Sequence, residues 1–162
     1  MQCKMRCFSL TCITMKTILV PVDFSDITGA VIEQAAVLAQ AFPGNLYLIH
    51  VAPPDPDFVG YEAGPQSVRD QVAAKFCKEH QALQKMSEDL RVQGIHATAL
   101  LVQGATAATI LEEAARLNAD VIVLGSHGHG GLYKALLGSV SEGLLRKTTR
   151  PLLIVPSRKE HA

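Results

Sequence analysis

Five short apolar segments alternate with four segments of helical periodicity, and this alternation constrains the fold more than any other feature of the chain. Buried parallel strands consist of short apolar runs, whereas amphipathic helices repeat apolar residues every three to four positions. Strands and helices in this alternation require right-handed crossovers, which give a parallel sheet with helices on both faces. The five predicted strands cover residues 17–22, 46–51, 96–102, 120–124 and 151–156.

The segments between the strands have recognisable helix boundaries. Ser25 or Asp26 is expected to cap the first helix, and Pro43-Gly44 is expected to end it. Residues 52–65 contain four prolines and are predicted to be irregular. The four predicted helices cover approximately residues 26–42, 67–93, 104–118 and 140–148.

The second helix is the longest of the four, and Gly94 is expected to stop it. Its apolar residues recur at helical spacing, which predicts one buried stripe along its length. The residues of that stripe are Val72, Phe76, Leu83, Met86 and Leu90.

Composition narrows the possible partners. The 162 residues suit one domain, with Lys and Arg numbering 15 and Asp and Glu also 15. A net charge of zero gives no indication of nucleic acid or an anionic membrane as a partner. No apolar run approaches the roughly 18 residues of a membrane span. Four cysteines, three of them near the N-terminus, do not form a disulfide framework or a zinc motif, so we expect a cytoplasmic protein.

The ends of the chain lie outside the strand and helix pattern. Residues 1–14 lack the long apolar core of a secretory signal and are predicted to be a poorly ordered extension. Both Met1 and Met15 are candidate start residues. One domain is expected over residues 15–158, followed by a short tail over 159–162.

A glycine-rich loop follows the fourth strand and leads into the last helix. Its spacing is G-x2-G-x9-G-S, formed by Gly125, Gly128, Gly138 and Ser139, which differs from the P-loop motif. Glycines let backbone N–H groups approach a ligand, and the N-terminus of a helix attracts anions, so the loop is a candidate phosphate site. Ser139 and Glu142 have the S-x-x-E spacing of a capping box, which predicts the helix start. Alternatively, the glycines end a strand and form a surface loop, and Ser139 is an ordinary N-cap.

Other polar residues have competing interpretations. Asp23 follows the first strand and is either a turn residue or a ligand residue. His127 and His129 form an H-x-H pair without a third metal ligand at fixed spacing, so hydrogen bonding to phosphate is favoured over metal binding. A Ser-His-Asp triad of Ser126, His127 and Asp120 lacks the G-x-S-x-G turn and is disfavoured. For His50, packing in the core is favoured over catalysis.

The chain resembles the universal stress protein family over essentially all of residues 16–157. The resemblance implies a Rossmann-like sheet of order 3-2-1-4-5, and the complete glycine motif resembles that of the ATP-binding members. The matching segments are Ile18-Leu-Val-Pro-Val-Asp-Phe-Ser25, His50-Val51, Ala119-Asp-Val-Ile-Val-Leu-Gly-Ser-His-Gly128, Leu137-Gly-Ser-Val-Ser141 and Pro151-Leu-Leu-Ile-Val155.

The resemblance implies an adenine nucleotide, ATP or its relatives ADP and AMP, with or without Mg²⁺. Asp23 would hold the adenosine part, and the main chain of Val51 would contact adenine. Position 129 is often Arg or Lys in the family, so His129 would make phosphate binding weaker or more sensitive to pH. The groups around ribose and phosphates, with the other members of the predicted site, would be Pro21, Gly125, His127, Gly128, Gly138, Ser139, Val140 and Ser141.

The resemblance also implies a homodimer that pairs its last strands. In the family order the fifth strand lies at an edge, and Leu152–Val155 is too apolar to stay uncovered. A helix or the chain's own tail covering that edge is the alternative to the dimer.

The leading hypothesis is a nucleotide-dependent regulator in a stress response, with an unknown client protein. The loop has no P-loop lysine, so fast phosphoryl transfer is not expected. One alternative is a slow ATPase in which His127 or His129 orients water and Mg²⁺ bridges the phosphates. Another is a dimeric interaction module that does not retain nucleotide.

Overall fold

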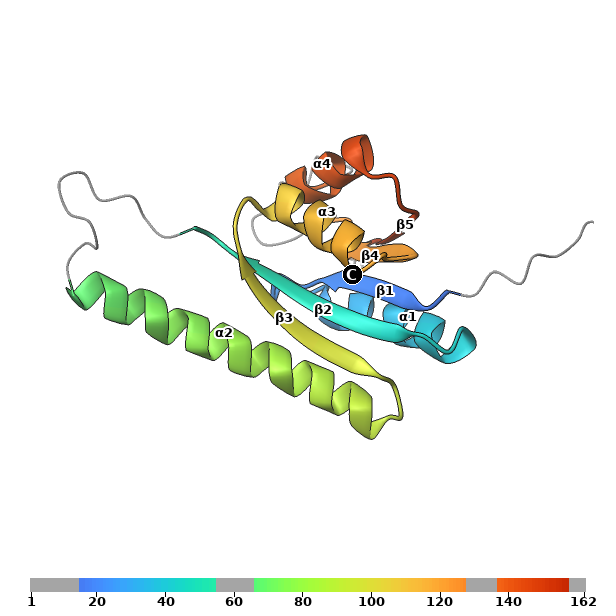
Figure 1. Cartoon of the computed structure of the whole chain (residues 1–162), viewed down its shortest axis with the longest axis horizontal. Coiled ribbons are helices and arrows are strands. Elements are labelled where there is room, and N and C mark those ends of the chain that lie inside the picture. Colours follow the sequence, from blue (N-terminus) through green and yellow to red (C-terminus); the bar gives the residue numbers. More distant parts are fainter. Residues whose placement is uncertain (1–14, 55–65, 128–136, 158–162) are drawn as a thin grey trace, which may run out of the picture.

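The computed structural model describes residues 15–54, 66–127 and 137–157. Strands and helices alternate along these residues, as predicted (Figure 1). The elements are β1 (Thr17–Pro21), α1 (Thr28–Ala41), β2 (Asn45–Ala52), α2 (Gln66–Val92), β3 (Ala97–Gln103), α3 (Thr106–Arg116), β4 (Val121–Gly125), α4 (Ser139–Lys147) and β5 (Leu152–Val155). The predicted disorder of residues 1–14 concerns residues outside the described part.

The five strands form one parallel sheet with the order β3-β2-β1-β4-β5. This confirms the α/β fold and the strand order 3-2-1-4-5. The central strand β1 pairs with β2 on one side and with β4 on the other, so the chain crosses the sheet between β3 and β4. Both faces of β1 are therefore buried, which explains its uninterrupted apolar sequence.

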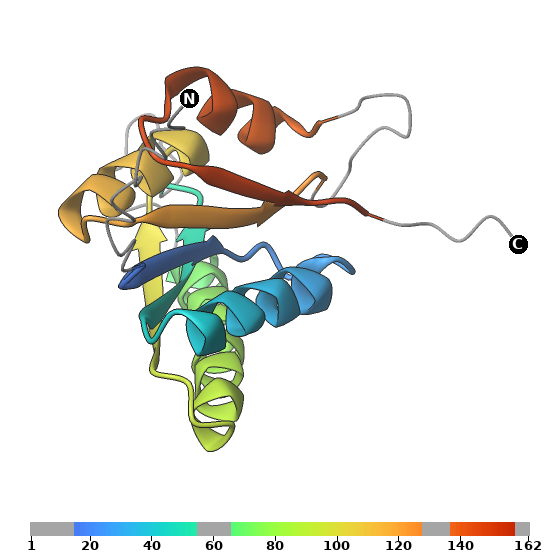
Figure 2. The ribbon, with the colours of Figure 1, turned by 90° about the vertical axis from the view of Figure 1, so that its right-hand side faces the viewer.

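Helices cover both faces of the sheet (Figure 2). Ile18 and Val20 of β1 point into a core formed with α1 and α2. Leu19, between them, points into a second core formed with α3 and α4. Side chains alternate between the faces of a strand, so one apolar run supplies both cores. No helix in the described residues is long and apolar enough to cross a membrane.

Helix α2 is buried mainly over its second half, where Leu83 and Leu90 enter the core. Val72 and Phe76, predicted in the buried stripe, are only partly buried. In Figure 1 the first turns of α2 extend beyond β3, so the sheet offers them little surface to cover. The helical period is therefore confirmed, whereas the predicted extent of the buried stripe is wrong.

Two predicted helix caps are wrong. The N-cap of α1 is Ile27, with no side-chain hydrogen bond, because the Ser25 hydroxyl instead donates to Asp23. Helix α4 also begins without a side-chain cap, so Ser139 and Glu142 do not form a capping box. The Glu142 carboxylate pairs with Arg146 one turn further along the helix.

The predicted stop of the second helix is confirmed. Gly94 follows the end of α2 with a φ of 81°. This value lies in the left-handed region, which favours glycine at the end of a helix.

Candidate functional site

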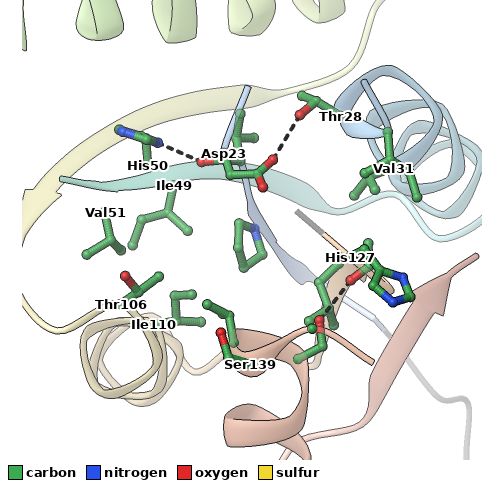
Figure 3. Close-up of a pocket in the computed structure, with 18 of the residues that line it drawn as sticks. Asp23, Thr28, Val31, Ile49, His50, Val51, Thr106, Ile110, His127 and Ser139 are labelled. Atoms are coloured by element: carbon green, nitrogen blue, oxygen red, sulfur yellow. Dashed lines mark hydrogen bonds between the residues drawn. The ribbon is translucent and has the colours of Figure 1, made fainter. Parts of the chain in front are cut away.

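A cavity of about 500 Å³ lies at the carboxyl ends of the central strands. The chain leaves β1 toward α1 and leaves β4 toward α4, and these helices lie on opposite faces of the sheet. In open parallel sheets a ligand crevice forms where the strand order reverses in this way. The site predicted between the loops after β1 and β4 therefore coincides with a real cavity (Figure 3).

The structure brings nine of the eleven predicted site residues to this cavity. They come from β1 and its following turn, from β2, from the end of β4 and from the start of α4. The other two, Gly128 and His129, lie outside the described residues. The nine are Pro21, Asp23, Val51, Gly125, His127, Gly138, Ser139, Val140 and Ser141. Their roles toward a ligand stay predictions.

Asp23 organises the turn between β1 and α1. Its Oδ1 accepts hydrogen bonds from the Ser25 amide at 3.1 Å and the Ser25 hydroxyl at 2.6 Å. The Thr28 hydroxyl donates to the same oxygen at 3.3 Å. Phe24 adopts a left-handed φ of 58°. Such a conformation is costly for a bulky side chain, so the turn is tightly specified, and it holds a carboxylate at the border of the cavity.

Hydrogen bonds join the start of α4 to the ends of β4 and β5. The Gly138 amide donates to the Ser126 carbonyl at 2.7 Å, and the Ser157 amide donates to the Ser126 hydroxyl oxygen at 3.0 Å. The Ser141 hydroxyl donates to the Gly125 carbonyl at 2.8 Å. The hydrogen of this hydroxyl therefore has a partner within the protein, and the role of Ser141 toward a ligand stays a prediction. The N–H groups of the first turn of α4 remain suited to an anion.

Gly125 is required by close packing. A Cβ atom at this position would lie 2.9 Å from Cγ2 of Ile27 and 3.2 Å from the His127 carbonyl oxygen. A side chain at residue 125 would therefore require Ile27, just before α1, and the backbone at His127 to shift. The first glycine of the motif therefore has a packing role beside the cavity.

The disfavoured catalytic triad does not exist in the structure. Nδ1 of His127 lies 3.1 Å from the Ser126 hydroxyl, but Asp120 lies at the opposite end of β4. The Asp120 carboxylate accepts hydrogen bonds from the amides of Lys16 and Thr17, at 2.8 and 2.9 Å. Asp120 thus fastens the start of β1 to the start of β4. Within the described residues, no group of three or more His, Cys, Asp and Glu could hold a metal ion.

Several residues on the cavity were not predicted. Thr106 and Ile110 come from α3, and Thr28 and Val31 come from α1. These residues reach the cavity because α1 and α3 pack beside it, and no local sequence motif encodes that packing. A helix start directly after the end of a neighbouring strand is the only signal that could have indicated Thr106.

His50 is buried, with 9% of its surface exposed, and it also borders the cavity. Its Nδ1 lies 2.7 Å from the Val22 carbonyl oxygen, and its ring centroid lies 4.7 Å from that of Phe24. His50 is thus packed in the core, as favoured from the sequence, but its ring also contacts the backbone that leads to Asp23.

Comparison with known proteins gives consistent matches along most of the chain. The model of the universal stress protein family matches residues 14–156. Universal stress protein MJ0531 of Methanocaldococcus jannaschii is 31% identical over 147 residues, which cover 90% of this chain and 84% of the relative. The solved structure of protein MJ0577 superposes with a TM-score of 0.75 at 25% identity, covering 91% of this chain and all of that one.

Two other similar structures contain adenine nucleotides. A universal stress protein in complex with cAMP has a TM-score of 0.64 at 22% identity, covering 90% of this chain and 99% of that chain. The universal stress protein of Archaeoglobus fulgidus in complex with dAMP has a TM-score of 0.61 at 22% identity, covering 87% and 98%. At this identity the likeness concerns the fold.

Proposed function

This chain belongs to the universal stress protein family, and on that basis we propose that it binds an adenine nucleotide and acts as a nucleotide-dependent regulator in a stress response. The observation that carries the proposal is the meeting of nine predicted ligand residues on one cavity of about 500 Å³. A cavity of this volume lies within the range of small-molecule sites. The cAMP and dAMP complexes of similar proteins support the choice of an adenine nucleotide.

The polar groups of the cavity suit the two ends of a nucleotide. The Asp23 carboxylate is a hydrogen-bond acceptor, which suits the hydroxyl or amino groups of adenosine. On the other side, the start of α4 contributes Ser139 and Val140, whose backbone N–H groups suit phosphate. We propose ATP as the ligand, with ADP and AMP as alternatives. Mg²⁺ would accompany the phosphates, since no protein cage for it is needed.

Slow or absent turnover is part of the proposal. Among the described residues that line the cavity there is no Lys or Arg, and Asp23 is the only carboxylate. Phosphoryl transfer relies on positive charge around the transferred group and on a residue that positions the nucleophile. The described cavity therefore offers groups for binding and few groups for catalysis. Regulation by bound nucleotide, in the cytoplasm, follows as the proposed activity.

Replacing Asp23 with alanine tests the proposed site. We expect the wild type to release a stoichiometric adenine nucleotide on denaturation, identified by chromatography. The Asp23→Ala variant is expected to bind added Mg-ATP about 10- to 100-fold more weakly, because hydrogen bonds to a charged group contribute about 1.5–3 kcal/mol. Titration calorimetry with ATP, ADP and AMP measures the change.

The exposed Asp26 in the same turn provides the matched control. The Asp26→Ala variant is expected to bind within about twofold of the wild type, because surface substitutions away from a site have small effects. A wild type that is empty and binds none of the three nucleotides would reject the proposal. The dimeric interaction module would then be the better description.

We further propose a homodimer through the edge strand β5. In the described structure, β5 pairs with β4 alone, and Leu153 is 37% exposed on this edge. Leu153→Lys is expected to convert a dimer into a monomer, because a charge on an edge strand opposes pairing with a second strand. Light scattering after size exclusion measures the mass. Val37→Lys, at a 58% exposed site on α1, should leave the dimer intact; dissociation by both variants would refute the β5 interface.

A further inference from the structure

A buried histidine and a largely buried glutamate face each other where β2 meets α2. Nε2 of His50 lies 3.6 Å from Oε2 of Glu79, too far for a hydrogen bond. Both atoms are fully buried and have no hydrogen-bond partner within the described part of the chain. Buried polar atoms are rarely left unsatisfied, so this pair needs a physical explanation.

The other nitrogen of His50 determines what the pair requires. Nδ1 lies 2.7 Å from the Val22 carbonyl oxygen. A carbonyl oxygen can only accept, so Nδ1 must carry a hydrogen. In a neutral ring Nε2 would then present a lone pair to the carboxylate of Glu79, and two acceptors would face each other. The Glu79 carboxylate therefore faces the Nε2 side of a ring whose Nδ1 side is held at the Val22 carbonyl.

This pair is connected to the turn that carries Asp23. The Val22 amide donates to the Ile49 carbonyl at 2.8 Å, while the Val22 carbonyl accepts from His50. The next two residues are Asp23 and the left-handed Phe24, whose ring lies against His50. A strained conformation persists only where the surrounding contacts enforce it. His50 supplies two of those contacts, through its Nδ1 and through its ring.

The charged groups around the pair come from two elements. Helix α2 contributes Glu79 and also Lys75, whose Nζ lies 3.7 Å from Oε1 of Glu79. The turn after β1 contributes the Asp23 carboxylate. The register partner of His50 on β3 is Leu101, which carries no charge. Glu79 thus lies between an exposed lysine and the buried imidazole.

We propose that His50 is a positioning residue of the nucleotide site: its Nδ1 holds the Val22 carbonyl and its ring packs on Phe24, and these two contacts keep Asp23 at the cavity. Because Glu79 of α2 faces the other side of the His50 ring, this helix also supports the nucleotide site, although Glu79 itself does not contact the ligand. This inference rests on the proposed nucleotide binding.

The test compares Mg-ATP affinity among variants of the full chain at one pH. In Glu79→Gln, an amide replaces the carboxylate that faces Nε2, and in His50→Asn, an amide nitrogen replaces Nδ1 at the Val22 carbonyl. Both variants are expected to bind within about threefold of the wild type.

His50→Leu removes the donor to Val22 and is expected to weaken binding about tenfold. Glu88→Gln is the control, because Glu88 pairs with Arg91 on the exposed side of the same helix. Equal affinities of His50→Asn and His50→Leu would overturn the positioning role, because only asparagine keeps a donor at the Val22 carbonyl.

A second readout does not depend on nucleotide. The ¹⁵N signals of the His50 ring report which nitrogens carry hydrogen, and those of Nε2 are expected to change on Glu79→Gln and stay the same on Glu88→Gln. Nε2 signals that are unchanged by both substitutions would overturn the contact between the ring and Glu79. A wild type that binds no nucleotide would reject the proposed function and with it the positioning role, while the ring signals would still test the contact between His50 and Glu79.

Discussion

Gly125→Val is expected to abolish nucleotide binding. A Cβ atom at residue 125 would already lie 2.9 Å from Ile27 and 3.2 Å from the His127 carbonyl oxygen, and valine adds two methyl groups to it. Ile27 and His127 both line the cavity, so any adjustment that admits the side chain displaces its walls. A nucleotide concentration of about 100 times the Kd raises the free energy of unfolding of a protein that binds it by about 2.7 kcal/mol. The Gly125→Val variant is expected to gain no such stabilisation.

Thermal unfolding with and without Mg-ATP measures this stabilisation directly. The shift between the two melting temperatures reports binding, while the melting temperature without nucleotide reports the cost to the fold. Gly29→Val is the control, because a Cβ atom on this glycine of α1 meets no atom within 4 Å. A wild-type shift in Gly125→Val would show that the predicted glycine motif does not border the ligand.

Leu144→Ala is expected to lower the free energy of unfolding by about 2–5 kcal/mol. Leu144 is completely buried and packs in the core with Ile110 of α3 and Ile122 and Leu124 of β4. Truncation removes apolar contacts and leaves a cavity between α4 and the sheet. Total stabilities of domains are about 5–15 kcal/mol, so this loss is a large share. Urea denaturation followed by circular dichroism measures the change.

The neighbouring Leu145 is the control, because it is the same residue type as Leu144 but is not buried. It belongs to the same helix but is 52% exposed. Leu145→Ala is therefore expected to change the free energy of unfolding by no more than about 0.5 kcal/mol. Equal losses at the two positions would contradict the assigned packing of α4. Because α4 also presents Ser139 and Val140 to the cavity, nucleotide binding should weaken in Leu144→Ala and persist in Leu145→Ala.

The strands were the most predictable part of this protein. Their segments are short and continuously apolar because helices cover both faces of the sheet, and this pattern is visible without any tertiary information. Gly94 was equally predictable, since a left-handed φ at a helix end favours glycine. The strand order followed from the family resemblance and is confirmed by the pairing of β1 with both β2 and β4.

Side-chain hydrogen bonds were predicted less well. Ser25 and Ser139 have the residue type and position of helix caps, but neither caps its helix. A serine hydroxyl has several partners within reach, and small differences in backbone path decide among them. Local sequence indicates those options, but it does not rank them.

The alternation of elements, the two-sided burial of the sheet and the glycine spacing at the end of β4 could all be predicted from the chain alone, because each depends on residues near one another in the sequence. The folded structure was needed to show that α3 brings Thr106 to the cavity, that Asp120 fastens the start of β4, and that Glu79 faces His50. Such contacts join distant parts of the chain, and Lys16 and Asp120 are 104 positions apart. Their partners are set by the crossovers and by helix packing, which no local pattern of residues encodes.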